Sequence, residues 1–340
     1  MTVITFERAL QKAEGNRHLL LGNGFSMAIK RDIFSYNSLY ENADFSKVPY
    51  AEKIFEALDT RDFEAVIRLL IDMAKVLKAY KKVDPSLVKQ IEYDANIIKD
   101  ILVTTIASKH PDRPYDISNE AYAHCREFLS NFSKIYTLNY DILLYWAVMH
   151  EEEGSVHIHH DDGFRSPEED EAADYVSWQE HNSPSIYYLH GALHLFDAGH
   201  EIIKYTWSRT DVPIIEQIRI ALDEGKYPMF VSEGYSKSKQ EKILHNAYLH
   251  KAFRSFSSIT GSIFIFGHSL DDNDDHVFNE IVNNTKIHSL YISIFGDPST
   301  ATNKKIIQKA STLIEKRLKK APRKPLSIEF FDAESAHTWG

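Results

Sequence analysis

The stretch LLLGNGFSMA, Leu19 to Ala28, is the point from which the fold of this chain can be inferred. Three leucines form a buried-strand pattern, a glycine-rich turn follows, and a helix begins soon after Ser26. One interpretation is a tight turn with Ser26 as the helix cap. The other is a phosphate-binding turn, because glycine lets a backbone approach a pyrophosphate and a helix N-terminus presents free N–H groups. The stretch lacks the full G-x-G-x-x-G fingerprint, so both interpretations stay open at this point.

Strand and helix patterns alternate along most of the chain. Helical spacing is found at residues 5–13, 49–110, 119–131, 140–150, 238–256, from 275, and at 302–319. Apolar runs predict strands at 19–21, 134–138, 185–189, 227–234, 262–267, 290–297 and 326–331. Several of these runs are apolar throughout, as expected for parallel strands covered on both faces. The sequence therefore predicts an α/β fold with a Rossmann-like, doubly wound, mainly parallel sheet.

The helical block between the first two of these strands suggests the domain organisation. We expect residues 1–30 and 132–340 to form the Rossmann-like core and residues 31–131 to form a helical insertion or cap. Residues 151–184 are polar, rich in acids and histidine, and without clear periodicity. We expect a long loop there, with a hairpin.

Composition narrows the class of protein. The chain has 340 residues and a formal net charge of -10, so we expect no direct nucleic-acid binding, which needs a concentrated basic face. No apolar run is long enough to span a bilayer, and the N-terminus does not resemble a signal peptide. Cys125 is the single cysteine, so an internal disulfide and a four-cysteine zinc site are excluded. We expect a cytoplasmic protein without membrane association.

Glycine or small polar residues follow five of the apolar runs. In an open parallel sheet, ligands bind beyond the carboxyl ends of the strands, so these segments are expected to line one polar crevice. They are Gly22-Asn23-Gly24-Phe25-Ser26, Asn139-Tyr140-Asp141, His190-Gly191, Gly267-His268-Ser269-Leu270-Asp271 and Gly296-Asp297.

Three of these residues have structural alternatives that stay open. Asn139 can cap a helix, and Asp141 can complement the helix dipole. A single histidine such as His190 is usually a structural residue with satisfied hydrogen bonds, although histidine is also the natural general base near neutral pH.

The order GNGFS, TLNYD, LHG, FGHSLDD resembles the sirtuin-like family of NAD-binding domains. The motifs cover residues 19–28 and, discontinuously, 133–297, and each follows a predicted strand. The lineage looks closest to the zinc-less, bacterial sirtuin-like proteins of anti-phage defence, which hydrolyse NAD. The resemblance implies that NAD is a substrate, with no separate cofactor and no catalytic metal.

The resemblance also implies roles for individual residues. His190 would be the catalytic histidine, while Asn139 and Asp141 would hold the nicotinamide ribose and its carboxamide side. The pyrophosphate and its neighbouring ribose would face Gly22, Asn23, Gly24 and Ser26, with Phe25 in the same turn. Gly267, Ser269 and Asp271 would line the phosphate and adenosine side, and His268 lies in the same loop without an assigned role. Asp297 is placed by geometry alone, as an acceptor for the adenine ribose hydroxyls.

The missing cysteines disfavour protein deacylation, because deacylating sirtuins carry a four-cysteine zinc module. Cleavage of NAD to nicotinamide and ADP-ribose is therefore the expected activity. An enzyme that depletes NAD needs control, for which we expect a regulatory partner, homo-oligomerisation, or residues 151–184 acting as a lid.

Two rival functions stay open. The sequence HIHHDD, His157 to Asp162, could bind a divalent metal and serve a metal-dependent hydrolase, or it could be a solvated loop. The crevice could instead hold NAD or ADP-ribose without cleaving it, as a sensor. Lys237 and Lys239, in the first turn of a predicted helix, could face a phosphate or simply be solvated.

Overall fold

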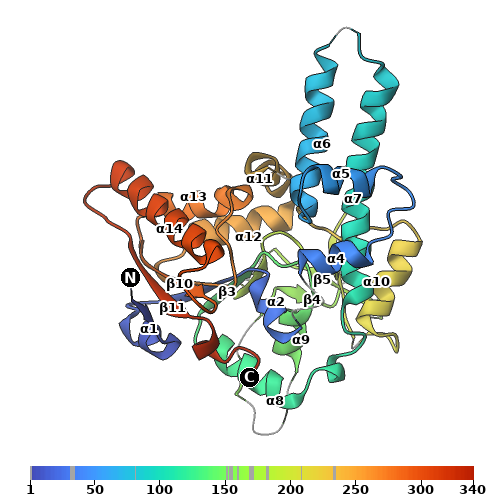
Figure 1. Cartoon of the computed structure of the whole chain (residues 1–340). Helices are drawn as coiled ribbons and strands as arrows, with labels where there is room; N and C mark the ends of the chain where they lie inside the picture. The colour runs from blue at the N-terminus through green and yellow to red at the C-terminus, as the bar shows by residue number, and fades with distance from the viewer. Residues whose placement is uncertain are drawn as a thin grey trace.

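Seven parallel strands form the central sheet of the computed structural model, which Figure 1 shows among its helices. Their order is β1-β11-β10-β9-β2-β3-β6. The structure describes all residues except 1, 31–34, 81, 151, 153–155, 159–160, 168–171, 181–183, 208 and 233–234. The strands are β1 (Val3–Ile4), β2 (Arg17–Leu21), β3 (Lys134–Thr137), β6 (Ile186–Tyr188), β9 (Gly261–Phe266), β10 (Ile287–Ile294) and β11 (Ser327–Asp332). The predicted α/β class and parallel sheet are confirmed.

Helices cover both faces of this sheet, which explains the wholly apolar strands. Leu19 and Leu21 belong to one buried cluster and Leu20 to another, because alternate side chains point to opposite faces. One face is covered by α1 (Phe6–Lys12), α8 (Asn119–Ser130) and α9 (Leu143–Met149). The other is covered by α12 (Ala247–Ser257), α13 (Asp275–Asn283) and α14 (Ala301–Lys320). The sheet is therefore doubly wound, as predicted.

The direction of winding reverses at β2. This strand lies between β3 and β9, so the chain first builds outward through β3 and β6 and later returns to add β9, β10 and β11 on the other side. In register, Leu20 lies opposite Tyr136 of β3 and Ile265 of β9. Such a switch point opens a crevice at the carboxyl ends of the strands.

The predicted helical stretch at 49–110 is confirmed as three helices between β2 and β3. They are α5 (Ala51–Ala57), α6 (Phe63–Lys78) and α7 (Pro85–Lys109), preceded by α2 (Gly24–Ile29) and α4 (Tyr36–Asn42). Asp62 caps α6 by accepting from the N–H groups of Glu64 and Ala65, and Asp84 caps α7 just before Pro85. The hairpin of α6 and α7 projects from the body of the molecule (Figure 1).

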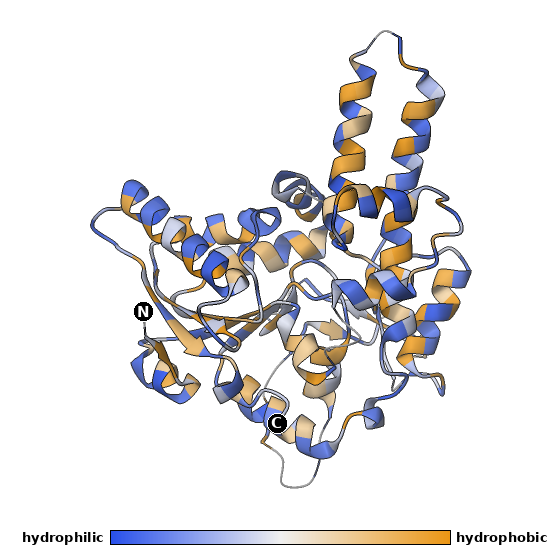
Figure 2. Cartoon of the chain, viewed as in Figure 1, coloured by the Kyte–Doolittle hydropathy of each residue, from blue (hydrophilic) through white to orange (hydrophobic). Residues whose placement is uncertain are grey.

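The hairpin exposes apolar side chains as well as polar ones. Figure 2 shows hydrophobic residues along both of its helices, and Leu69, Met73 and Val76 of α6 are all exposed. Among the residues that the structure describes, no helix combines the length and apolar character needed to cross a membrane.

Helix α8 lies within the range predicted for the helical insertion, residues 31–131, and that boundary stays a prediction. Within that range, α8 follows the 3-10 helix η1 (Pro114–Asp116) and packs on the sheet rather than on the hairpin. Its Phe128 ring lies 5.2 Å from the ring of Phe6 and 5.1 Å from that of Phe266.

A second sheet was not anticipated from the sequence. It is antiparallel, in the order β4-β5-β8-β7, and is followed by α10 (Ile214–Asp223). Its strands are β4 (Phe164–Arg165), β5 (Tyr175–Trp178), β7 (Leu195–Asp197) and β8 (Ile202–Tyr205). The predicted hairpin within 151–184 is confirmed as β4 and β5, which belong to this sheet, while the other described residues of the segment form no strand or helix.

Two further predictions need correction. No strand forms in the described part of 227–234; Phe230 only makes an isolated bridge with Gly191. The helix predicted at 238–256 is two helices, α11 (Ser236–His245) and α12, because Asn246 is extended and caps α12 by accepting from the N–H of Leu249.

Candidate functional site

Five neighbouring strands deliver the predicted site segments to the same edge of the sheet. In spatial order they are β6, β3, β2, β9 and β10. One to three residues beyond their ends lie His190, Asn139, Gly22, Gly267 and Asp297 respectively. The predicted convergence on one edge is therefore seen, although the five segments do not all contact one another.

The turn after β2 is held directly against the turn after β9. Gly22 N–H donates to the carbonyl of Phe266 at 2.9 Å, and Gly24 N–H donates to that of Gly267 at 2.7 Å. A Cβ atom on Gly24 would lie 2.5 Å from the Cα of Gly267, and one on Gly22 would lie 2.8 Å from the Cβ of His268. The two glycines are required by this close backbone approach, whatever else the turn binds.

Ser26 does not cap a helix, so that alternative is wrong. The helix α2 begins at Gly24, with Asn23 at the N-cap position, and Ser26 lies inside it, fully buried. Its hydroxyl donates to Asp141 Oδ2. Phe25 points into the core instead, where its ring lies 5.1 Å from that of Trp339.

Asn139 and Asp141 tie the turn after β3 to the turn after β2. The amide nitrogen of Asn139 lies 3.0 Å from the carbonyl oxygen of Gly22 and 3.0 Å from Ser26 Oγ, and it donates to both. Asn139 is not a helix cap, because α9 begins only at Leu143. Asp141 accepts from the Leu143 N–H at 2.9 Å, and burial raises the pKa of this carboxyl group.

His190 lies in a second, adjoining polar cluster. Its Nε2 is 3.0 Å from Nε2 of His276 on α13 and 3.9 Å from Oδ1 of Asp274. Burial, followed by the nearby Lys239 ammonium, holds the pKa of His190 well below its usual range. Burial also lowers the pKa of His276 to about 4. Both imidazoles are therefore neutral near pH 7.

Asp274 is the centre of this cluster. It lies in the 3-10 helix η2 (Asp272–Asp274) and accepts from Lys239 Nζ at 2.9 Å and from His268 Nε2 at 3.0 Å. Burial alone would raise the pKa of Asp274, but the ammonium of Lys239 and the imidazole of His268 together lower it well below its usual range. Asp274 is thus an ionised, buried carboxylate.

Glu64 connects the cluster to the helical insertion. This residue of α6 accepts from Lys239 Nζ at 2.7 Å and from the Asn273 amide at 2.9 Å, and the Tyr140 hydroxyl lies 3.0 Å from its other oxygen. Lys239 is 1% exposed and is shared between two carboxylates. The hypothesis that Lys237 and Lys239 act together on a phosphate is therefore weakened, since Lys237 is 87% exposed.

Three of the predicted site residues point away from these clusters. Ser269 donates to Asp271, which pairs with Lys305 of α14 at 3.1 Å. Asp297 is exposed and accepts from the backbone and hydroxyl of Ser299, at the start of the turn that leads to α14. The structure thus brings together the residues near β2, β3, β6 and the first part of the β9 turn.

The cluster residues that the sequence analysis does not name are Glu64, Asp274 and His276, while Lys239 is named there for a different role. The run DDNDDH, 271–276, directly continues the motif FGHSLDD, and this proximity is the sequence signal that points to Asp274 and His276 as site residues. Glu64 gave no signal, because a glutamate in the first turn of a helix is expected on dipole grounds alone.

A divalent metal is poorly suited to the His190 cluster. The ligand atoms of His190, Asp274 and His276 all lie within 4.8 Å of one another, and two imidazoles with a carboxylate can bind zinc. However, the Lys239 ammonium already lies 2.9 Å from Asp274. A metal ion on the same carboxylate would be repelled by that buried positive charge.

The rival loop at 157–162 also has other partners for its carboxylates. His159 and His160 lie outside the described residues. Asp161 pairs with Arg165 through two hydrogen bonds, which lower the pKa of Asp161, and Asp162 pairs with Lys204 of β8. These ion pairs occupy the two acids that a metal would need.

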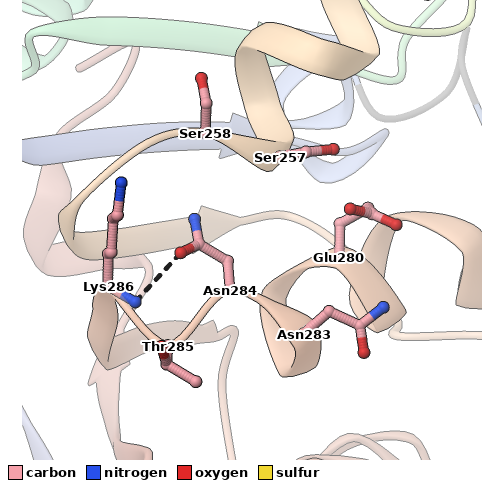
Figure 3. A pocket seen from close by; sticks show the side chains of 7 residues that line it. All are labelled: Ser257, Ser258, Glu280, Asn283, Asn284, Thr285 and Lys286. Carbon is pink, nitrogen blue, oxygen red and sulfur yellow. Dashed lines mark hydrogen bonds between the residues drawn. The ribbon is translucent and has the colours of Figure 1, made fainter.

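A polar pocket lies at the opposite edge of the sheet, before β9 and β10. Figure 3 shows its lining, in which the Lys286 N–H donates to Asn284 Oδ1 at 3.0 Å. The pocket is lined by Ser257, Ser258, Glu280, Asn283, Asn284, Thr285 and Lys286. It contains none of the predicted site residues, as expected if ligands bind at the carboxyl edge.

Comparison with known proteins places the chain in a family without assigning an activity. Among curated proteins, none matches it. A family model described as "Domain of unknown function (DUF4917)" matches residues 19–339, from the start of the first apolar run to Trp339. Because this match spans nearly the whole chain, the protein belongs to the DUF4917 family.

Proposed function

We propose that this protein is an NAD glycohydrolase, which releases nicotinamide and ADP-ribose. The observation that carries the proposal is the junction of the glycine turn, Ser26 and Asn139 at the switch point of the sheet, beside the buried cluster of His190. A dinucleotide is the ligand class expected at this place in a doubly wound sheet. The resemblance of the four motifs to sirtuin-like domains points to the same substrate.

The reaction needs little covalent help from the protein. The bond between C1′ of the ribose and the nicotinamide nitrogen breaks, and its electron pair stays on nicotinamide. Water then forms a bond to the cation-like C1′, and its proton passes to a base. We assign this base to His190, which is neutral near pH 7 because burial lowers its pKa.

Asn139 would position the nicotinamide ribose. Its amide hydrogens are committed to Gly22 and Ser26, so the direction of its Oδ1 is fixed before substrate arrives. A dipole that is already oriented needs no reorganisation during the reaction, which is the main electrostatic contribution of an active site. Asp141 fixes Ser26 and thereby supports the same arrangement.

The proposed enzyme is closed in this structure. Asn139 is 7% exposed and His190 is 2% exposed, so NAD must displace covering groups before it reaches them. This agrees with a restrained NADase of anti-phage defence that a regulatory partner or a second copy activates.

The test is to incubate the purified full-length chain with NAD and to quantify nicotinamide and ADP-ribose by chromatography, which also separates a cyclic product. His190→Ala and Asn139→Ala are compared with His288→Ala, an exposed histidine that contacts only Ser289 among its described partners. Release by the parent and by His288→Ala, but by neither site variant, supports the proposal. Tight NAD binding without release would indicate a sensor or an enzyme that awaits its activator, and absence of both would overturn the proposal.

A further inference from the structure

The geometry points to Asp274 as a positioning residue that sets the tautomer of His190, so that Nε2 of His190 carries the proton and Nδ1 is the basic nitrogen. The assignment of the tautomer stands on contacts within the chain. Only its consequence for turnover rests on the proposed NAD glycohydrolase.

The contact between the two histidines requires a choice of tautomer. Nε2 of His190 and Nε2 of His276 are 3.0 Å apart, so in the neutral pair one nitrogen donates and the other accepts. If His190 donates, His276 is protonated at Nδ1, which can donate to Ser236 Oγ at 3.4 Å. The reverse arrangement would put the proton of His190 on Nδ1.

Asp274 decides between these two arrangements. Asp274 also acts on His276, since ligand atoms of the three residues lie within 4.8 Å of one another, but Oδ1 of Asp274 pairs with His190, 3.9 Å from its Nε2, and makes no ion pair with His276 among the described contacts. A buried carboxylate attracts the proton to the nearer nitrogen. His190 therefore carries its proton on Nε2. Its lone pair is then on Nδ1, the nitrogen that does not face His276.

The charge of Asp274 is maintained by two hydrogen-bond donors, His268 and Lys239. His268 accepts from the Leu270 N–H at its Nδ1, so its Nε2 carries a proton and donates to Asp274 Oδ2. Lys239 of α11 donates to Oδ1 and is in turn held by Glu64 of α6. Because Glu64 shares the ammonium, Lys239 neutralises only part of the charge that Asp274 presents to His190.

Among the described groups that face His190, only one attracts a proton by its charge. The groups are Asp274 on η2, Lys239 on α11, His268 after β9, His276 on α13 and the ring of Tyr140 before α9. Asp274 is the only anion among them, and it raises the pKa of His190, whereas Lys239, His276 and His268 lower it. No other described group in this set can hold a proton on Nε2 by charge.

The test compares Asp274→Asn with the unmodified chain, using histidine labelled with nitrogen-15. Long-range proton–nitrogen spectra show which ring nitrogen of His190 is protonated, and the His190 signals are identified by their loss in His190→Gln. Asp94→Asn is the matched control, because Asp94 is also buried but lies on α7 and contacts Gln90. This readout needs no NAD hydrolysis.

We expect the parent and Asp94→Asn to show His190 protonated on Nε2. Asp274→Asn is expected to move the proton toward Nδ1 and to lower kcat by about 10²-fold, with KM changed by less than about threefold. Glu64→Gln is expected to cause a smaller loss in the same direction, because Lys239 is then left to Asp274 alone.

A His190 protonated on Nδ1 in the parent would overturn the proposal, and so would an unchanged tautomer in Asp274→Asn. Loss of thermal stability without a change of tautomer would show that Asp274 is only structural. If the parent neither binds NAD nor releases nicotinamide but the tautomer responds as expected, the proposed function fails while the assignment stands.

Discussion

Replacing Lys239 by methionine tests the buried ion network directly. The substitution keeps most of the side-chain volume and removes one positive charge that lies 2.7 Å from Glu64 and 2.9 Å from Asp274. Two buried carboxylates are then left without their shared cation. Breaking a buried ion pair from one side typically costs about 3–5 kcal/mol of stability.

The expected change in melting temperature follows from the length of the chain. At about 2.1 cal/mol/K per residue, the unfolding entropy of a 340-residue protein is about 0.7 kcal/mol/K. The loss in stability of about 3–5 kcal/mol therefore lowers Tm by about 4–7 °C.

The assay is thermal unfolding followed by circular dichroism at pH 7 and one fixed scan rate. Lys237→Met is the control, because Lys237 is on the same helix but 87% exposed, and its Tm should stay within about 1 °C of the parent. Adding Glu64→Gln to Lys239→Met should restore part of the lost stability, since one uncompensated charge is removed. If Lys239→Met melts together with Lys237→Met, the ion network does not contribute as described.

Three further predictions use other features of the structure. Gly24→Ala should lower Tm more than Gly225→Ala, because a Cβ atom at residue 24 would lie 2.5 Å from the Cα of Gly267. At Gly225 no described atom lies within 4 Å of the new Cβ, and only the positive φ of 75° causes strain. Equal Tm values would contradict the close contact. The free energy of unfolding should fall as the pH drops from 7 to 5, because burial lowers the pKa of three histidines from 6.5 to about 4. The unfolded chain then binds more protons than the folded chain, and the loss is about 2 kcal/mol per histidine. A Tm that does not change with pH would refute this. These histidines are His18, His110 and His276. Treatment with EDTA should leave NAD hydrolysis unchanged, because Lys239 occupies the carboxylate of Asp274; activity that is lost and then restored by zinc would show a catalytic metal.

The central sheet could be predicted because its strands carry their own signal. The run at 262–267 is apolar at nearly every position, which is the pattern of a strand covered on both faces, and β9 is indeed buried throughout. The second sheet carries no such signal, because its strands have two to four residues, too few to establish a period. Phe230 shows the opposite error, since an apolar run became a single bridge rather than a strand.

The candidate site was predictable only where it follows a strand. Asn139, His190 and Gly267 were found because the carboxyl ends of parallel strands meet at one edge. Glu64 and Lys239 reach the same place from helices, and their contact joins residues 175 positions apart in the sequence. A single sequence contains no information on which distant helix faces meet, so Lys239 was noticed without its partners.

The first strand of the sheet has consequences for synthesis on the ribosome. β1 pairs only with β11 along the edge of the sheet, with Val3 opposite Phe330. The helix α2, which begins in the glycine turn, is also held by a residue 314 positions later in the sequence, since the Trp339 indole donates to the Phe25 carbonyl at 2.9 Å. A nascent chain must therefore hold its first strand and its glycine turn without these supports until Trp339 has left the ribosome exit tunnel, and translation that stops early leaves the crevice unbraced.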